Sequence, residues 1–297
     1  MISPAHDGPR AIRLALLAYA AFSTMDTAVK LLSARFHPVQ IACLVAAVSL
    51  LVPVLAACLR GEPHRLRTRA PWLQLLRGLL MLVGGVAAFA AYALMPLADA
   101  YAIAFTMPLL VTALAVPLLG ERVGARRWAA IGVGFAGVLV MLRPGSGIAG
   151  LGALAALVNV LGNGLALTLI RRAHARESAE AFAFWGNLVI AAGTALALPW
   201  LWRTPDLADL GLFLLAGICG GTAFLVLAQA FRLAPAAVVA PFQYSQMPYA
   251  ILAGLVLFGD RPDPMTLLGA AIVIAMGLYL LQQEQRSAAM APTRCPR

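Results

Sequence analysis

Long apolar runs, separated by short polar connections, occupy almost the whole chain. A membrane-spanning helix needs about 20 predominantly apolar residues. By this criterion the pattern predicts ten spanning helices, at about residues 11–32, 37–59, 73–95, 98–119, 126–143, 148–170, 180–202, 208–231, 235–258 and 265–282. The connections between them are too short to hold a soluble domain. The expected fold class is therefore all-α, a polytopic membrane protein.

The two halves of the chain share one pattern. Met-Pro at 107–108 and at 247–248 each begins an apolar stretch that ends in Gly-acid-Arg, at 120–122 and at 259–261. The offset is 140 residues at Met-Pro and 139 at the glycine. We interpret the Gly-acid-Arg segments mainly as helix C-caps that mark architecture.

This repeat predicts two units of five spans each, over residues 1–145 and 146–283, followed by a disordered cytoplasmic tail over 284–297. Because five is odd, the second unit must cross the membrane in the opposite sense to the first. Inverted repeats around a central cavity are typical of secondary transporters.

Composition supports a membrane protein. Hydrophobic residues make up 62% of the chain and charged residues 11%, whereas a soluble domain has about a quarter charged residues. The net charge of +10 is divided among short patches between the apolar runs, which argues against a nucleic-acid partner.

The same basic residues predict the orientation, because cytoplasmic loops are enriched in Lys and Arg. With a cytoplasmic N-terminus, four arginines face the other side, namely Arg35, Arg143, Arg203 and Arg261. Sixteen then lie on the cytoplasmic side: Arg10, Arg13, Arg60, Arg65, Arg67, Arg69, Arg122, Arg126, Arg127, Arg171, Arg172, Arg176, Arg232, Arg286, Arg294 and Arg297. We expect a bacterial inner-membrane protein with both termini in the cytoplasm.

Metal and cofactor chemistry has little support. The four cysteines form no CxxC pair, and the four histidines lie outside the apolar runs. The runs also hold no carboxylate pair of the kind that a membrane-embedded enzyme would use, and the chain has no nucleotide-binding motif. We expect no metal, no cofactor and no enzymatic activity.

Three segments resemble the EamA family of the drug/metabolite transporter superfamily. They are PLADAYAIAFTMPLLVTALAVPLLGERVGARRWAAIGVGFAGVLVMLRPG (96–145), LAPAAVVAPFQYSQMPYAILAGLVLFGDRPD (233–263) and RGLL (77–80). The resemblance implies a ten-helix bundle whose helix pairs open a central cavity to either side in turn. One departure is Asp260, where the family usually has Glu.

Within that family, ADAYAIAFTMPL and APFQYSQ are similar to carriers of riboflavin, S-adenosylmethionine and amino acids. The expected function is secondary-active transport of a small metabolite by alternating access, best a planar ring-containing solute such as riboflavin. Alternatives are an amino-acid exporter, an S-adenosylmethionine carrier, a non-transporting partner or sensor, and a membrane-embedded enzyme. The expected partners are the solute and the lipid bilayer, with the chain a monomer or homodimer.

The first span carries an acid and a base inside its apolar run. Asp26 lies about 22 Å along the helix from Ala11, and Lys30 follows at i+4 in the favourable acid-before-base order. In one interpretation Lys30 extends to the interface and neutralises Asp26 on the way. In the other, Asp26 faces the cavity as a substrate contact or proton site. Both are candidate coupling or gating residues.

The sixth span carries Asn159 and Asn163 at i, i+4 spacing, on one face of the helix. Asn163 lies 137 residues after Asp26, close to the repeat offset, so the two are expected at related positions on opposite cavity walls. The alternative is hydrogen bonding between helices.

The ninth and fourth spans supply the other substrate candidates. In the ninth, Gln243 and Tyr244 lie between Pro241 and Pro248, two prolines that permit a kink. The fourth carries Tyr101, Phe105 and Thr106 before Pro108. Their alternative role is packing against a neighbouring helix. The three prolines are candidate gating residues.

Two further candidates lie elsewhere. Arg77 is about one turn into the third span, where it can either extend to the interface or bind an anionic group. Trp185 in the seventh span is a lesser candidate for substrate contact.

Overall fold

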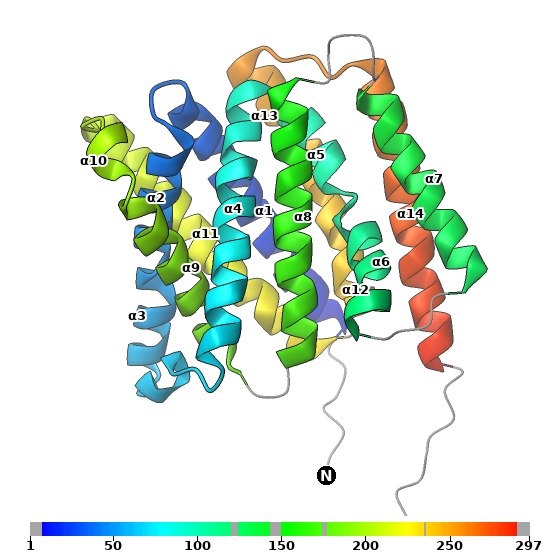
Figure 1. Cartoon of the computed structure of the whole chain (residues 1–297), viewed down its shortest axis with the longest axis horizontal. Coiled ribbons are helices and arrows are strands. Elements are labelled where there is room, and N and C mark those ends of the chain that lie inside the picture. Colours follow the sequence, from blue (N-terminus) through cyan, green and yellow to red (C-terminus); the bar gives the residue numbers. More distant parts are fainter. Residues whose placement is uncertain (1–7, 120–123, 143–149, 174–176, 235, 290–297) are drawn as a thin grey trace, which may run out of the picture.

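The computed structural model describes residues 8–119, 124–142, 150–173, 177–234 and 236–289. These residues form helices and turns, with no strand among them, so the all-α prediction is confirmed. The helical segments lie side by side in a single bundle (Figure 1).

Helical segments fall in each of the ten expected ranges. Those of the first half are α1 (Gly8–Ser33), α2 (Pro38–Ser49), α3 (Leu51–Leu59), the 3₁₀ turn η1 (Pro63–Leu66), α4 (Pro71–Leu94), α5 (Leu97–Ala104), α6 (Met107–Leu119) and α7 (Ala125–Leu142). Those of the second half are α8 (Leu151–Ala173), α9 (Ala179–Ala195), α10 (Leu198–Leu201), α11 (Leu207–Leu233), α12 (Ala236–Val239), the 3₁₀ segment η2 (Ala240–Ser245), α13 (Gln246–Ala253), the π-helical turn η3 (Gly254–Phe258) and α14 (Pro264–Ala289).

Six helical segments within the described ranges are long and apolar enough to cross a membrane, and two of them join α2 with α3 and α5 with α6. The count of ten spans stays a prediction, because the other expected spans are shorter or built from several pieces. The last helix is longer than expected. Residues 284–289, placed in a disordered tail from the sequence, continue α14, and residues 290–297 lie outside the described part.

Each half contributes one helix to each of two equivalent packed pairs, an arrangement that we call the exchange pattern. α1 lies along α11, and their counterparts α8 and α4 lie along each other in the same way. α7 lies beside its own counterpart α14, as Figure 1 shows at its right-hand side. Glycines permit the close crossings. A Cβ added to Gly162 of α8 would lie 2.8 Å from the Leu80 carbonyl oxygen and 2.9 Å from the Cα of Gly84.

Two spans are discontinuous. The fourth breaks at Phe105 and Thr106, between α5 and α6, and the ninth passes through η2 before α13 begins. At each break a hydroxyl bonds to the carbonyl oxygen three residues earlier, from Thr106 to Ile103 at 2.7 Å and from Ser245 to Phe242 at 2.6 Å. These two hydroxyl residues are 139 positions apart, which equals the repeat offset at the glycine.

Proline explains where each second piece begins. Pro108 and Pro248 lie in the first turns of α6 and α13, where a missing N–H leaves no helical hydrogen bond unmade. Pro241 lies in the first turn of η2. The kink expected in the ninth span is therefore present, whereas the break in the fourth was not predicted.

We name the two ends of the bundle by their place in Figure 1. The upper end carries Ser33, the last residue of α1, and the lower end carries Leu59, the last residue of α3. Ion pairs connect loops from both halves at each end. Arg35 bonds to Asp206 at 2.7 Å and to Asp209 at 2.9 Å at the upper end.

At the lower end Glu180 of α9 accepts from two arginines, Arg60 at 2.9 Å and Arg65 at 3.3 Å. Both ends therefore have ties at the side of the bundle where α2 and α9 lie against each other.

Candidate functional site

Asp26 lies at the centre of the candidate site. Its side chain is 5% exposed on the inner face of α1. The Tyr101 hydroxyl of α5 donates to its Oδ2 at 2.6 Å, and the Tyr92 hydroxyl of α4 also hydrogen-bonds to this carboxylate. Two hydroxyl donors stabilise a buried carboxylate, because a buried polar group without hydrogen bonds is unfavourable.

Lys30 does not neutralise Asp26, so that interpretation of the i, i+4 spacing is wrong. Its ammonium donates to Asp260 Oδ2 at 3.0 Å and to the Met95 carbonyl oxygen at 3.0 Å. It also lies 4.8 Å from the ring centroid of Phe258. The lysine extends toward the upper end, away from the tyrosines that hold Asp26.

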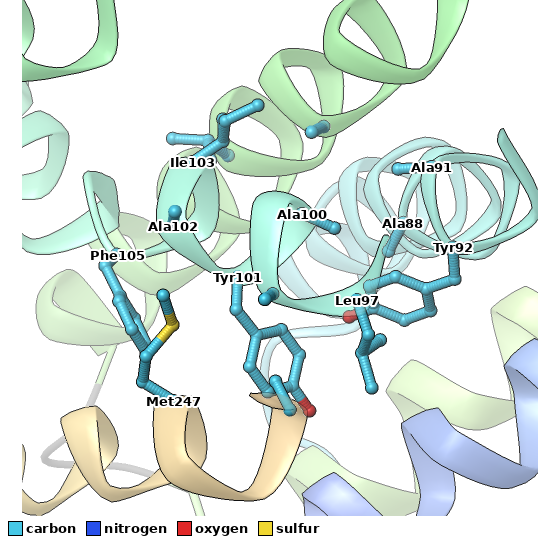
Figure 2. Close-up of a cluster of buried hydrophobic side chains, with 14 of the residues drawn as sticks. Ala88, Ala91, Tyr92, Leu97, Ala100, Tyr101, Ala102, Ile103, Phe105 and Met247 are labelled. Carbon is cyan, nitrogen blue, oxygen red and sulfur yellow. The ribbon is translucent and has the colours of Figure 1, made fainter. Parts of the chain in front are cut away.

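Five aromatic rings from α4, α5 and η2 form a continuous line, which we call the aromatic ladder: Phe89, Tyr92, Tyr101, Phe105 and Tyr244. The centroids of neighbouring rings are 6.3, 6.2, 6.2 and 5.1 Å apart in that order. Figure 2 shows Tyr92, Tyr101 and Phe105 on adjoining segments, with Met247 of α13 against Phe105. The ladder joins the two halves of the chain beside Asp26.

Tyr244 ends the ladder in an unusual contact. Its hydroxyl is buried and has no hydrogen-bond partner among the described residues. The hydroxyl occupies the space above Gly277 of α14, where an added Cβ would lie 1.8 Å from it. Gln243, the neighbouring candidate, is partly buried in the same 3₁₀ segment.

Thr106 lies at the break between α5 and α6, and its side chain is not free to bind a ligand. It is fully buried, at 0% exposure, and its hydroxyl bonds to Ile103 as described above.

The two asparagines of α8 bond to each other. Asn163 Nδ2 donates to Asn159 Oδ1 at 2.6 Å, so both lie on one helix face as expected. That face packs on α4, since a Cβ added to Gly84 would lie 2.7 Å from Asn163 Nδ2. In the other half, Met25, the neighbour of Asp26, makes the matching contact with Gly220 of α11. The two polar positions thus occupy related crossings, but the structure does not bring them together.

Arg77 is buried at 3% exposure between α4 and α9. Its guanidinium donates to Gln74 Oε1 at 3.1 Å, to the Met81 sulfur and to the Phe182 carbonyl oxygen, and it lies over the Phe182 ring. The guanidinium therefore does not extend to the interface, and its contacts hold α4 against α9. Binding of an anionic group, the other interpretation, stays a prediction.

Trp185 lies apart from the ladder. Its indole Nε1 donates to the Leu66 carbonyl oxygen at 3.0 Å, and its ring packs edge-on against Phe184. It fixes the lower-end turn η1 to α9.

Three contributors were missed from the sequence: Tyr92, Asp260 and Gly277. Tyr92 carries the one polar side-chain group in the apolar run AAYAL, and that hydroxyl is the signal in the sequence. Asp260 was interpreted only as part of a helix cap. That cap is present, because Gly259 has a φ of +69° and follows η3. The matching glycine at 120 lies outside the described residues.

An apolar helical bundle in which two related, discontinuous spans meet near the middle is the architecture of a secondary transporter. The chain matches the EamA-like transporter family over residues 9–143 and again over residues 150–282. It therefore belongs to the EamA-like transporter family, a two-repeat family of the drug/metabolite transporter superfamily, and is a small-metabolite transporter.

Curated relatives span most of the chain. A riboflavin transporter of Rhizobium johnstonii is 34% identical over 230 residues, which is 74% of each chain. An S-adenosylmethionine uptake transporter of Rickettsia bellii is 27% identical over 92% of this chain and 93% of that one. A crystal structure with 22% identity and a TM-score of 0.66 covers 93% of this chain and 98% of its own, which shows the shared fold.

Proposed function

We propose that this chain moves a planar ring-containing solute across the bacterial inner membrane by alternating access, with riboflavin as the first candidate. The observation that carries the proposal is the aromatic ladder beside the buried Asp26. Ring faces stack on planar solutes, and hydroxyl, amide and carboxylate groups read a ring's polar edge. Similarity to a riboflavin transporter supports this choice.

In this proposal Tyr101, Phe105 and Tyr244 separate to admit the solute, and Gln243 contacts its edge. The unpartnered Tyr244 hydroxyl supports such a role, because an approaching solute would supply the hydrogen bond that the protein leaves unmade. Asp26 serves as the coupling residue, since no lysine is committed to its carboxylate. The asparagine pair Asn159 and Asn163 forms the related position in the second half.

Architecture and location are part of the same proposal. The repeat units run over 1–145 and 146–283, the upper end faces away from the cytoplasm, and both termini are cytoplasmic. The chain acts as a monomer or homodimer and catalyses no covalent reaction. The exchange pattern of α1, α4, α8 and α11 supports the repeat.

Transport by the purified chain in proteoliposomes tests the proposal. The panel is riboflavin, S-adenosylmethionine, an aromatic amino acid and an aliphatic amino acid, each with an imposed solute or proton gradient. We expect ring-containing solutes to move, and Asp26→Asn to lower the initial rate about tenfold or more, which corresponds to about 1.4 kcal/mol. Tyr249→Phe is the control, because Tyr249 is 47% exposed and lies outside the ladder.

Movement of the aliphatic amino acid alone would overturn the choice of solute. Equal rates for Asp26→Asn and Tyr249→Phe would remove Asp26 from the coupling role.

A further inference from the structure

Lys30 is the single lysine among the 22 basic residues of the chain, and three groups surround its ammonium. They are the Asp260 carboxylate, the Met95 carbonyl oxygen and the ring face of Phe258. A compact ammonium with three donors suits three partners in different directions better than a planar guanidinium does. The lysine side chain is 12% exposed and that of Asp260 is 29% exposed.

These partners come from both halves of the chain. Lys30 lies in the last turn of α1, and Met95 follows α4, so both belong to the first half. Phe258 and Asp260 follow α13 in the discontinuous ninth span. The lysine therefore joins α1, the α4–α5 turn and the ninth span, whose Tyr244 is the last ring of the aromatic ladder.

Local backbone structure aims Asp260 at the lysine. The π-helical turn η3 ends at Gly259, whose left-handed φ of +69° reverses the chain. The Asp260 N–H then donates to the Gly254 carbonyl oxygen at 2.9 Å, which fixes the residue beside the end of α1.

Several carboxylates lie near the lysine at the upper end. Asp99 at the start of α5 interacts electrostatically with Asp260, with Asp263 before α14, and with Lys30. Without the lysine, like charges from α5 and the ninth-to-tenth-span turn would repel one another at the upper end.

The lower end lacks an equivalent lysine. Offsets of 137 to 140 residues, the range that relates the two halves, carry position 30 onto Leu167, Thr168, Leu169 and Ile170. None of these is charged. Ties at the side of the bundle occur at both ends, from Arg35 above and from Glu180 below, whereas among the described residues the Lys30–Asp260 ion pair occurs at the upper end.

We propose that Lys30, Asp260, Phe258 and the Met95 carbonyl form a gating latch that closes the upper end in one state of the transport cycle. The latch opens when that end admits or releases solute, and its presence at the upper end biases the resting population toward the state closed above. The proposal rests on alternating access, the proposed function, and adds Asp260 to the residues that control it.

Sided chemical labelling tests the latch without any solute. Ser23 is 2% exposed and lies one turn before Asp26 on α1. In a chain whose native cysteines are replaced, a single Ser23→Cys is treated with a membrane-impermeant maleimide from each side of sealed vesicles. A separate single cysteine at exposed Thr204 identifies the side of the upper end.

We expect Lys30→Gln and Asp260→Asn each to raise the labelling rate about fivefold or more from the upper-end side only, the lower limit of a typical coupling between states. The charge exchange Lys30→Asp with Asp260→Lys should restore slow labelling. Arg35→Gln is the matched control, because it breaks a side tie at the same end.

Unchanged labelling in both Lys30→Gln and Asp260→Asn would overturn the latch. An equal rise in Arg35→Gln would do the same, because loss of any upper-end charge would then explain the effect. Each variant is first checked for a single elution peak in detergent, and either latch variant alone suffices if the other fails to fold. Failure here with solute transport intact would leave the proposed function standing.

Discussion

The Tyr244 hydroxyl shows how tightly single atoms are placed in this bundle. It is buried against Gly277 and bonds to none of the described residues, which is unfavourable by about 1–3 kcal/mol for an unsatisfied polar group. The ring is held nonetheless, because Phe105 packs edge-on against it at 5.1 Å and 79°.

A double-mutant cycle tests this contact. Gly277→Ala should lower the free energy of unfolding by about 1–3 kcal/mol, because its Cβ would overlap the hydroxyl. Tyr244→Phe should leave stability unchanged or raise it, and should reduce the loss in the double variant. Thermal unfolding in detergent measures all four proteins. A double variant as unstable as Gly277→Ala alone would contradict the contact.

At the residue scale the sequence predicted which side chains belong to the site better than it predicted their hydrogen-bond partners. It named Tyr101, Phe105 and Tyr244 as substrate candidates and Asp26 as a separate coupling candidate. The structure places Tyr101 against Asp26 and Phe105 against Tyr244. The sequence paired Asp26 with Lys30, because i, i+4 spacing is visible in a sequence. The actual partners lie 75 and 230 residues away, and only tertiary packing decides such contacts.

Among elements, α4 and α8 cross closely. Gly162 and Gly84 bring the two helices within reach of each other's backbone. In lipid, such packing contributes much of helix association, because the tails are as apolar as the side chains.

Two glycine substitutions make a matched pair for this crossing. Gly162→Ala should lower stability by about 1–3 kcal/mol, because the methyl group would meet the backbone of α4. Gly85→Ala should be neutral or stabilising by up to about 1 kcal/mol, since nothing lies within 4 Å of its added Cβ and alanine favours a helix. Thermal unfolding in detergent compares them. Similar losses in both variants would mean that the crossing does not limit stability.

At the element scale, the helices that follow a continuous apolar run were predictable, and the breaks within spans were less so. Apolar length located the helical segments within a few residues, because each must bury or shield its backbone. The break at Phe105 and Thr106 was missed because the apolar run over 98–119 is continuous in the sequence. The Thr106 hydroxyl donates to a backbone carbonyl oxygen at the break. A threonine in an apolar run does not by itself predict that hydrogen bond.

The whole molecule is held at its ends by contacts between halves, and one of them lies in the loops outside the spans. The Arg35 guanidinium beside Asp206 lowers the pKa of that carboxyl to about 2 from its ordinary value of 3.8. Asp206 also caps α11, accepting from the Asp209 N–H at 2.9 Å, while Asp209 accepts from Asp206 at 3.0 Å.

This pair has a defined pH window. A depressed carboxyl pKa stabilises the fold above about 3.8, and the contribution disappears as pH falls toward about 2. The difference in Tm between the wild type and Arg35→Gln should therefore be the same at pH 7 and pH 5. It should shrink only below pH about 4. A difference already lost at pH 5 would contradict the pair as the cause.

The repeat was predictable at this scale because it is written in the order of residues, with Met-Pro and Gly-acid-Arg recurring at one offset. The asymmetry of the latch was not, because it depends on which side chain reaches across the halves. Asp260 looked like one of two equivalent acids, and only the position of Lys30 distinguishes it.

The broken spans also have a consequence for biogenesis. α5 and α13 each contain eight residues, about 12 Å of helix, whereas the hydrocarbon core is about 30 Å thick. Neither piece can shield its own ends from lipid. We therefore expect the long helices α1, α4, α8 and α11 to enter the bilayer and associate first, and the two broken spans to pack among them late in assembly.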